Sequence, residues 1–260
     1  MTRVIVCGAL GKMGFTACGA VAAEDGLELT AAVDVAFDSE SARNSFSHEG
    51  IPLFASISEC LEHEEVDVAV DFTTPDAVFG NVMACLEKGV HSVVGTTGIT
   101  PSQLKEIEAK AGAGSANCLV APNFAIGAVL MMMLSRQVAR YMPACEIIEL
   151  HHDQKLDAPS GTALRTAELI AEGRAADIEP PGPEGSSARG LQDGGTPIHS
   201  VRLPGLVAHQ EVLFGGTGQT LSIRHDSISR ESFMPGVILA VRRVGELDGL
   251  AVGLEKVLQI

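Results

Sequence analysis

Residues 149–163, with the sequence ELHHDQKLDAPSGTA, place two histidines, a lysine and a predicted helix start in one connection. Histidine is the side chain whose ordinary pKa lies nearest neutrality, so it exchanges protons at physiological pH. Lys155 adds a compact cation with movable donors, while Ser160, Gly161 and Thr162 offer backbone N–H groups at the helix start. This combination predicts acid–base chemistry on an anionic substrate.

His151 and His152 are adjacent, and neighbouring strand residues point to opposite faces. If the strand continues through His152, one imidazole exchanges a proton with the reacting centre while the other, with Lys155, holds a carboxylate. The structural alternative is two histidines hydrogen-bonded to backbone carbonyls. A metal site using His151, His152, Asp153 or Asp157 is disfavoured because no His-x3-His pair or further Cys/His group accompanies these residues.

Composition excludes several classes of function. A chain of 260 residues with 46% hydrophobic content is long enough for one large domain or two modest ones. The net charge of -15 argues against a nucleic-acid partner, because proteins bind nucleic acid mainly through clustered Lys and Arg. The six cysteines are scattered without a CxxC pair, as expected of buried thiols in a reducing cytoplasm. No stretch reaches the ~20 apolar residues of a membrane span, and no signal peptide is visible, so we expect no membrane association.

The N-terminal segment has the pattern of a nucleotide-binding turn. A strand at 4–7 is followed by GALGKMG at 8–14 and a helix at 15–24. Gly8 permits a tight turn, Gly11 lets the backbone approach a pyrophosphate, and Gly14 permits close helix–strand packing. A plain tight turn is the alternative. An ATP-type GxxxxGK[ST] loop is excluded because Val6 stands where its first glycine belongs.

Asp34 follows the next predicted strand, 27–33, where an acid that binds the cofactor ribose belongs. No arginine follows it at Val35 or Ala36, and its carboxylate would repel a 2'-phosphate. We therefore expect NADH as the preferred cofactor, with NADPH possible through Lys12.

Strands continue to alternate with helices, which predicts a Rossmann-type, doubly wound parallel α/β sheet. The remaining strands are expected at 67–71, 92–94 and 118–121, and the helices at 75–88 and 101–113. Ligands bind such sheets beyond the strand carboxyl ends. The segments 72–74, 95–98 and 121–124 should therefore line one crevice, although 95–98 also fits a turn with a helix cap.

The second half predicts a different, α+β domain for substrate binding and oligomerisation. Its expected elements are helices at 126–142 and 162–172, the latter capped by Ser160, and strands at 146–150, 198–202, 208–214 and 220–224. The last three strands read as consecutive and antiparallel, giving an open, mixed sheet. One sheet face needs cover by the two helices or by another subunit, so a homo-oligomer is expected.

The domain boundaries follow from this change of pattern. We expect a dinucleotide-binding domain over 1–124, completed by a helix at 230–244 within 229–260, and a substrate domain over 125–228. The segment 180–197 is rich in Pro, Gly and Ser and is expected to be irregular, either as a mobile lid or as a tolerated loop.

The motifs also carry a resemblance. The 149–163 string, with GALGKMG at 8–14, GTTG at 95–98 and APNF at 121–124, resembles the 4-hydroxy-tetrahydrodipicolinate reductase (dihydrodipicolinate reductase) family of diaminopimelate and lysine biosynthesis. The motifs occur in the family's order over nearly the whole chain. The resemblance implies NAD(P)H-dependent reduction of a small dicarboxylate, 4-hydroxy-tetrahydrodipicolinate, to tetrahydrodipicolinate by a homotetramer, with the substrate between the two domains.

The resemblance also implies a role for each matching residue. His151 and Lys155 correspond to the catalytic proton donors, and His152, Gly161 and Thr162 to the substrate-binding residues. The cofactor-binding residues it implies are Gly8, Ala9, Leu10, Gly11, Lys12, Met13, Asp34, Gly95, Thr96, Thr97, Ala121, Pro122, Asn123 and Phe124. Some family members carry an arginine where this chain has Val35, which leaves the use of NADPH open.

Two other classes of protein share part of this pattern. Another two-domain nicotinamide-dependent dehydrogenase would share the glycine turn but would not explain residues 149–163. A non-catalytic NADH-sensing protein would keep the first domain and need neither Lys155 nor the anion site at the helix start.

Overall fold

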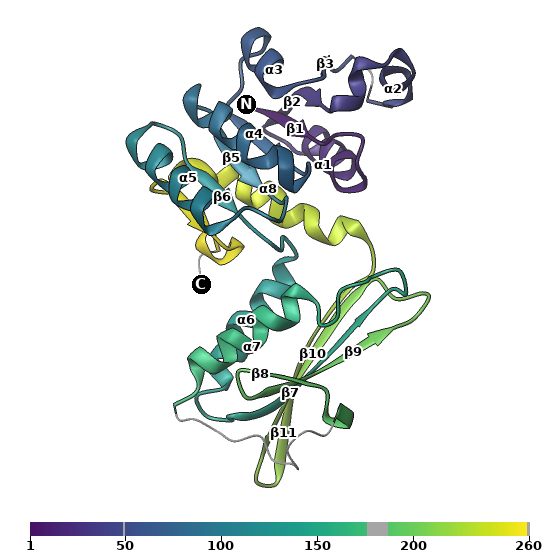
Figure 1. The fold of residues 1–260 in the computed structure, drawn as a ribbon, viewed down its shortest axis with the longest axis vertical. Coiled ribbons are helices and arrows are strands. Elements are labelled where there is room, and N and C mark those ends of the chain that lie inside the picture. The colour runs from purple at the N-terminus through teal and green to yellow at the C-terminus, as the bar shows by residue number, and fades with distance from the viewer. Residues whose placement is uncertain (49, 176–186, 259–260) are drawn as a thin grey trace. The chain divides into compact units, whose positions relative to one another are not determined.

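The computed structural model describes residues 1–48, 50–175 and 187–258. These residues form two units, one made of residues 1–124 and 233–260 and the other of residues 125–232 (Figure 1). The chain returns to the first unit at residue 233, whereas the sequence predicted residue 229. Each unit has its own sheet, so we describe them separately.

The first unit is built on a seven-stranded, fully parallel sheet. Its strands are β1 (Thr2–Cys7), β2 (Leu27–Val33), β3 (Leu53–Phe54), β4 (Val68–Asp71), β5 (His91–Val94), β6 (Cys118–Val120) and β12 (Leu250–Val252). They lie in the order β12-β6-β5-β4-β1-β2-β3, so the direction of winding reverses between β1 and β4. This order confirms the predicted Rossmann-type fold, in which ligands bind beyond the strand ends at that reversal.

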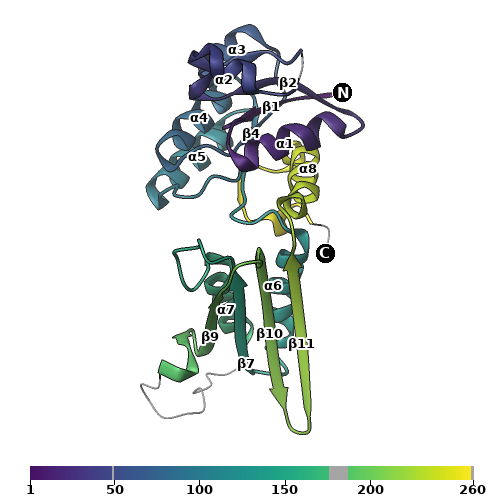
Figure 2. The same cartoon turned by 90° about the vertical axis from the view of Figure 1, so that its right-hand side faces the viewer.

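Helices cover both faces of this sheet (Figure 2). They are α1 (Lys12–Ala23), α2 (Glu40–Ser45), α3 (Ile57–His63), α4 (Pro75–Glu87), α5 (Pro101–Ala113) and α8 (Met234–Arg243), with 3-10 turns at Val35–Asp38, Val244–Glu246 and Leu254–Lys256. Helices α3, α4 and α5 pack in succession, and α1 packs against α8. Helix α1 begins at Lys12 rather than at residue 15, so the last three residues of the GALGKMG segment belong to the first turn of the helix.

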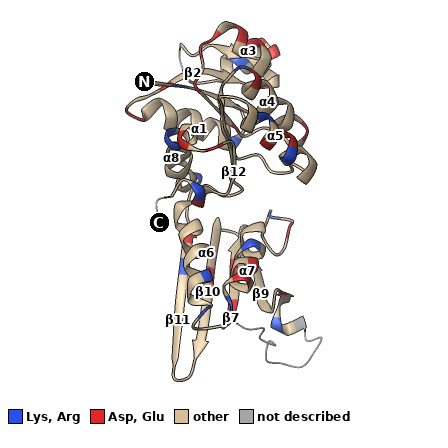
Figure 3. Ribbon diagram, turned by 90° about the vertical axis from the view of Figure 1, so that its left-hand side faces the viewer, with Lys and Arg blue, Asp and Glu red and all other residues tan. Residues whose placement is uncertain are grey.

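Hydrogen bonds connect the C-terminal segment, residues 233–260, to the rest of the first unit. Arg242 of α8 donates to Glu24 Oε1 at 2.6 Å and to the Asp25 carbonyl at 2.8 Å, just after α1. The Asn117 amide donates to the carbonyls of Val244 at 3.0 Å and Leu247 at 2.7 Å. These contacts explain how β12 joins the sheet edge beside β6. Elsewhere, acidic and basic residues are spread over both units, with acidic residues gathered around α3 (Figure 3).

All six cysteines are buried free thiols, as predicted. Burial raises the pKa of the Cys18, Cys60 and Cys85 thiols to about 12. They therefore stay protonated near neutral pH and act as small apolar core residues.

The second unit has an open, mixed, five-stranded sheet. Its strands are β7 (Ala144–His151), β8 (Leu191–Asp193), β9 (Thr196–Arg202), β10 (Ala208–Gly216) and β11 (Gln219–Ser227), in the order β11-β10-β7-β9-β8. The predicted mixed sheet is confirmed, and so is the antiparallel pairing of the strands at 208–214 and 220–224, but the predicted pairing of the strands at 198–202 and 208–214 is wrong. Strand β7 lies between β9 and β10, because the connection at 203–207 crosses β7 instead of forming a hairpin; β7 pairs with β9 in parallel.

The segment expected to be irregular is partly regular. Asp193 pairs with Thr196 across a two-residue turn, and both turn residues have positive φ, +53° at Gly194 and +72° at Gly195. Only glycine adopts two such conformations easily, so the pair closes a tight β8–β9 hairpin. The prediction of irregular structure was therefore wrong for 191–197, while its part at 180–186 lies outside the described residues.

Two helices, α6 (Ile126–Val138) and α7 (Gly161–Gly173), lie on one face of this sheet (Figure 2). They bury Ile147, Val212 and Phe214. The opposite face carries half-buried Ile148, and Leu213 there is 36% exposed. Helix α6 ends at Val138 rather than at residue 142. Among the described residues, no helix is long and apolar enough to span a membrane.

We predict that Gly14→Ala destabilises the first unit. A Cβ at Gly14 would lie 2.0 Å from the Gly8 carbonyl oxygen, so the helix must move away from the turn. The expected loss is about 1–3 kcal/mol, the usual range for overpacking. Urea unfolding measures it. Gly80→Ala is the control, because a Cβ on that exposed α4 residue meets nothing within 4 Å. Equal stability of the Gly14 variant and wild type would contradict the packing argument.

Candidate active site

The glycine turn joins three elements at the carboxyl edge of the first sheet. Gly8 has φ +77°, and a Cβ there would lie 2.3 Å from the Phe72 carbonyl oxygen that follows β4. Gly11 is the N-cap of α1 and has no side chain to occupy the first N–H groups of this 12-residue helix. The turn therefore presents backbone donors and the positive end of the helix dipole to an anion.

Asp34 lies beside this turn, as the sequence predicted. Its Oδ2 accepts from the Leu10 amide at 3.0 Å and its Oδ1 from the Ala36 amide at 3.1 Å. The carboxylate is thereby held at the end of β2, next to the glycine turn. The following residue, Val35, is 80% exposed and apolar.

A buried aspartate that sequence reasoning did not assign organises the neighbouring strand ends. The Asp71 side chain, at the end of β4, is buried and accepts hydrogen bonds from Thr73 Oγ1 at 2.7 Å, Thr96 Oγ1 at 2.6 Å and Asn81 Nδ2 at 2.8 Å. It also accepts from the Thr73 amide at 3.0 Å. These bonds tie the connection after β5, which contains Thr96, to β4 and α4. The sequence feature that could have identified Asp71 is the one that identified Asp34, namely a carboxylate at the end of an apolar strand.

Phe72 completes this edge by contacting two of the predicted cofactor segments. A Cβ at Gly95 would lie 2.2 Å from Phe72 Cε1, so glycine there makes room for the ring. The Phe72 and Phe124 rings pack edge to face with centroids 5.9 Å apart. The structure thus gathers Gly8, Gly95, Thr96 and Phe124 around one strand end. Their neighbours Thr97, Pro122 and Asn123 lie on the same two connections.

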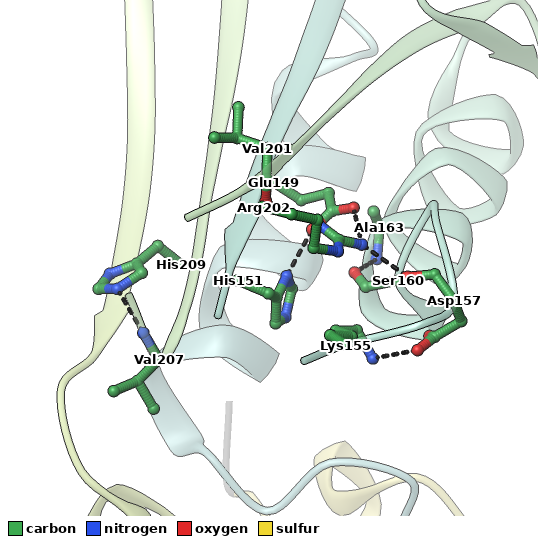
Figure 4. Close-up of polar contacts among 10 residues, drawn as sticks. All are labelled: Glu149, His151, Lys155, Asp157, Ser160, Ala163, Val201, Arg202, Val207 and His209. Atoms are coloured by element: carbon green, nitrogen blue, oxygen red, sulfur yellow. Dashed lines mark hydrogen bonds and ion pairs between the residues drawn. The ribbon is translucent and has the colours of Figure 1, made fainter. Parts of the chain in front are cut away.

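In the second unit, β7 ends with Glu149 and His151 on one face (Figure 4). The Glu149 side chain is fully buried. It accepts from Arg202 of β9 through Nη2 to Oε1 at 2.8 Å and Nη1 to Oε2 at 2.9 Å, and it contacts His151 Nδ1 through Oε2. Arg202 was not predicted, because its place beside Glu149 depends on the unpredicted parallel pairing of β7 with β9.

These contacts determine the charge of Glu149. Burial alone would raise its pKa, but hydrogen bonds from His151 and Arg202 outweigh burial and lower the pKa to about 2. Glu149 is therefore ionised at neutral pH. Arg202 compensates a buried charge that would otherwise be strongly unfavourable.

Lys155 lies in the connection after β7, and Arg202 also binds this connection. Its Nζ donates to Asp157 Oδ1 at 2.7 Å, and this hydrogen bond lowers the pKa of Asp157. Arg202 Nη2 donates to the Asp157 carbonyl at 2.6 Å. A continuous polar chain therefore runs from Lys155 through Asp157 and Arg202 to Glu149 and His151 (Figure 4).

Helix α7 begins at Gly161, as the sequence predicted within one residue. Buried Ser160 caps it by accepting from the Ala163 amide at 3.2 Å. Gly161 is exposed, and a Cβ there would meet nothing within 4 Å. The first turn of a 13-residue helix thus faces open space at Gly161, where an anion is favoured.

His152 is the predicted site residue with the least defined surroundings. Strand β7 ends at His151, so the alternation argument does not extend to His152. Its half-buried ring makes no hydrogen bond within the described part of the chain. In those same ranges no three His, Cys, Asp or Glu side chains come together as metal ligands.

Comparison with known families matches both units. Residues 2–124 match "Dihydrodipicolinate reductase, N-terminus", and residues 127–258 match "Dihydrodipicolinate reductase, C-terminus". A 4-hydroxy-tetrahydrodipicolinate reductase from Listeria welshimeri is 49% identical over 98% of this chain and 99% of its own. The enzyme of the same name from Halalkalibacterium halodurans is 48% identical over the full length of both chains.

Solved structures of other proteins are also similar to this chain. A dipicolinate-bound dihydrodipicolinate reductase from Paenisporosarcina sp. TG-14 superposes with a TM-score of 0.89 and 45% identity, covering 99% of this chain and 100% of that one. A probable dehydrogenase from Thermotoga maritima superposes with a TM-score of 0.67 at 12% identity, covering 98% of this chain and 92% of that one. At that identity the second likeness shows the fold alone.

Proposed function

The chain belongs to the dihydrodipicolinate reductase family, and we propose on that basis that it reduces 4-hydroxy-tetrahydrodipicolinate to tetrahydrodipicolinate with NAD(P)H, in lysine and diaminopimelate biosynthesis. The observation that carries the proposal is the second unit's site. An oriented histidine, a lysine and an open helix N-terminus occur together there, as the family motif requires.

The first unit has the features needed to hold a nicotinamide dinucleotide. The glycine turn and uncapped α1 suit a pyrophosphate, and Asp34 suits a ribose. The segments 95–97 and 121–124 are proposed to complete the cofactor site. The cofactor supplies a hydride to the substrate. Because Asp34 is followed by exposed, apolar Val35, NADH is proposed as the preferred cofactor, and NADPH remains compatible through Lys12.

The second unit is proposed to bind the two substrate carboxylates. Lys155 and His152 supply positive charge or donors, and the amides of Gly161 and Thr162 supply the helix N-terminus. The dipicolinate in the Paenisporosarcina enzyme is a dicarboxylate of the same kind.

His151 and Lys155 are proposed to manage the protons. The substrate loses water, and the reduced product takes up one proton for each hydride. A group that donates this proton must present an N–H to the substrate. His151 Nε2 and Lys155 Nζ are the atoms assigned to this task.

An assay with freshly prepared 4-hydroxy-tetrahydrodipicolinate tests the function. We expect loss of NADH absorbance that requires the substrate and is slower with NADPH. Oxidation of NADH by sugars or amino acids instead would favour another two-domain dehydrogenase. Binding of NADH without turnover on any of these compounds would favour a sensor.

We also propose a homotetramer located in the cytoplasm. The second sheet's face opposite α6 and α7 includes Ile148, Leu150 and Val201, which are only half-buried, and partly exposed Leu213. Contact between such faces of separate copies would bury them. The buried free thiols suit a reducing compartment.

Lys155→Ala should lower kcat by about 10²- to 10⁴-fold, the contribution of a positioned acid, and leave the Kd for NADH unchanged. Steady-state kinetics and NADH titration measure the two effects. His151→Gln should behave in the same way. A variant with wild-type kcat would remove the assigned role from that residue.

Gly161→Ala should raise KM for the substrate roughly tenfold, equivalent to ~1.4 kcal/mol, because the added methyl group enters the space proposed for a carboxylate. Stability should not fall, since the methyl group meets nothing within 4 Å. Gly112→Ala in α5 is the matched control, with the same open surroundings in the other unit. The same KM in both variants would place the carboxylate elsewhere.

Asp34→Ala should weaken NADH binding while relatively favouring NADPH, because it removes the proposed ribose acceptor and its repulsion of a 2'-phosphate. The ratio of kcat/KM for the two cofactors measures the change. Equal losses with both cofactors would indicate that Asp34 acts only through its bonds to the Leu10 and Ala36 amides.

A further inference from the structure

The two oxygens of Glu149 accept from three nitrogen donors, and the Ser200 side chain is a further hydrogen-bond partner. Oε2 takes His151 Nδ1 and Arg202 Nη1, and Oε1 takes Arg202 Nη2. The side chain is fully buried, so water does not replace a lost donor. Each donor therefore helps to compensate the buried negative charge.

This arrangement selects one state of the His151 imidazole. An ionised carboxylate has no proton to give and acts only as an acceptor. The hydrogen in the contact must therefore belong to His151 Nδ1. A ring turned by a half rotation would point carbon at Glu149 and remove one of its three donors. Nε2 then stays on the side away from Glu149, and no other described group hydrogen-bonds it.

From this geometry we infer that Glu149 is a positioning residue for the reduction: it holds His151 with Nδ1 protonated, so that Nε2 is the atom that exchanges the proton with the substrate. The inference rests on the proposed function, in which His151 is a proton donor. Glu149 touches neither substrate nor cofactor in this account and acts through His151.

Arg202 makes the positioning rigid. Its guanidinium binds both Glu149 oxygens and so removes the carboxylate's freedom to rotate. Through the Asp157 carbonyl, the same guanidinium holds the connection that carries Lys155. The strand end and the following connection therefore share one anchor.

Glu149→Gln tests the inference with almost no change of shape. Glutamine has one acceptor oxygen and one NH2 group, so a donor from His151 or Arg202 must face another donor. We expect kcat to fall roughly 10- to 100-fold, as when a partner that orients an active imidazole is removed. KM for the substrate should change less than about threefold, because the binding groups stay in place.

The decisive comparison introduces Glu149→Gln into wild type and into His151→Gln. If Glu149 acts through His151, the loss seen in wild type should shrink to less than about threefold in the second background. An equal loss in both backgrounds overturns the inference and leaves the proposed function intact. If His151→Gln alone keeps wild-type kcat, the proposed role of His151 falls, and the inference with it.

Glu146→Gln is the matched control. Glu146 lies on the same strand and also pairs with an arginine and a histidine, Arg189 and His199, but on the other side of the sheet. It should keep wild-type kcat, and an equal loss there would assign the effect to general damage of β7 and overturn the inference. If the glutamine variant at 149 does not fold, the same cycle with Glu149→Asp applies. Aspartate keeps the charge opposite Arg202, and its shorter side chain withdraws the oxygen from His151.

Discussion

The second unit depends on one buried charge pair, Glu149 with Arg202. A buried, ionised carboxylate has lost its hydration and needs hydrogen-bond donors in its place. The two hydrogen bonds from Arg202 and the contact with His151 supply such donors. The pairing links β7, β9 and the connection before α7. The pair thereby orients the His151 ring and holds the connection that carries Lys155 and leads into α7.

In the first unit, backbone geometry and uncharged hydrogen-bond donors hold the glycine turn and the strand ends in place. Close approach at Gly8 and Gly14 brings α1 onto the turn, and the carboxylates of Asp34 and Asp71 bind the connections around it. Both aspartates end parallel strands, where the sheet leaves carboxyl ends open to ligands. Local order at these strand ends suits a cofactor that must hold its nicotinamide in a defined position.

Local patterns predicted much of this structure. The strand at 27–33 and the starts of α4, α5 and α6 were predicted correctly, because hydrophobic runs, prolines and glycine turns report on nearby residues. Pairings between distant segments were not predicted. The insertion of β7 between β9 and β10 has no local signal, so Arg202 could not be assigned. The Asp193-Gly194-Gly195-Thr196 hairpin did have one, since paired glycines favour such a turn. The assignment of His151 and Lys155 as the proton donors came from the family motif, whereas the anion site at Gly161 and Thr162 was also predicted from residue types and spacing.

The nitrogen atom of His151 that carries the proton shows whether Glu149 positions this ring. Nitrogen NMR of the enzyme with labelled histidine distinguishes a ring protonated at Nδ1 from one protonated only at Nε2. We predict that His151 carries a proton on Nδ1 in wild type, because ionised Glu149 accepts from it. A neutral His151 with its only proton on Nε2 would show that Glu149 does not hold the ring in this state.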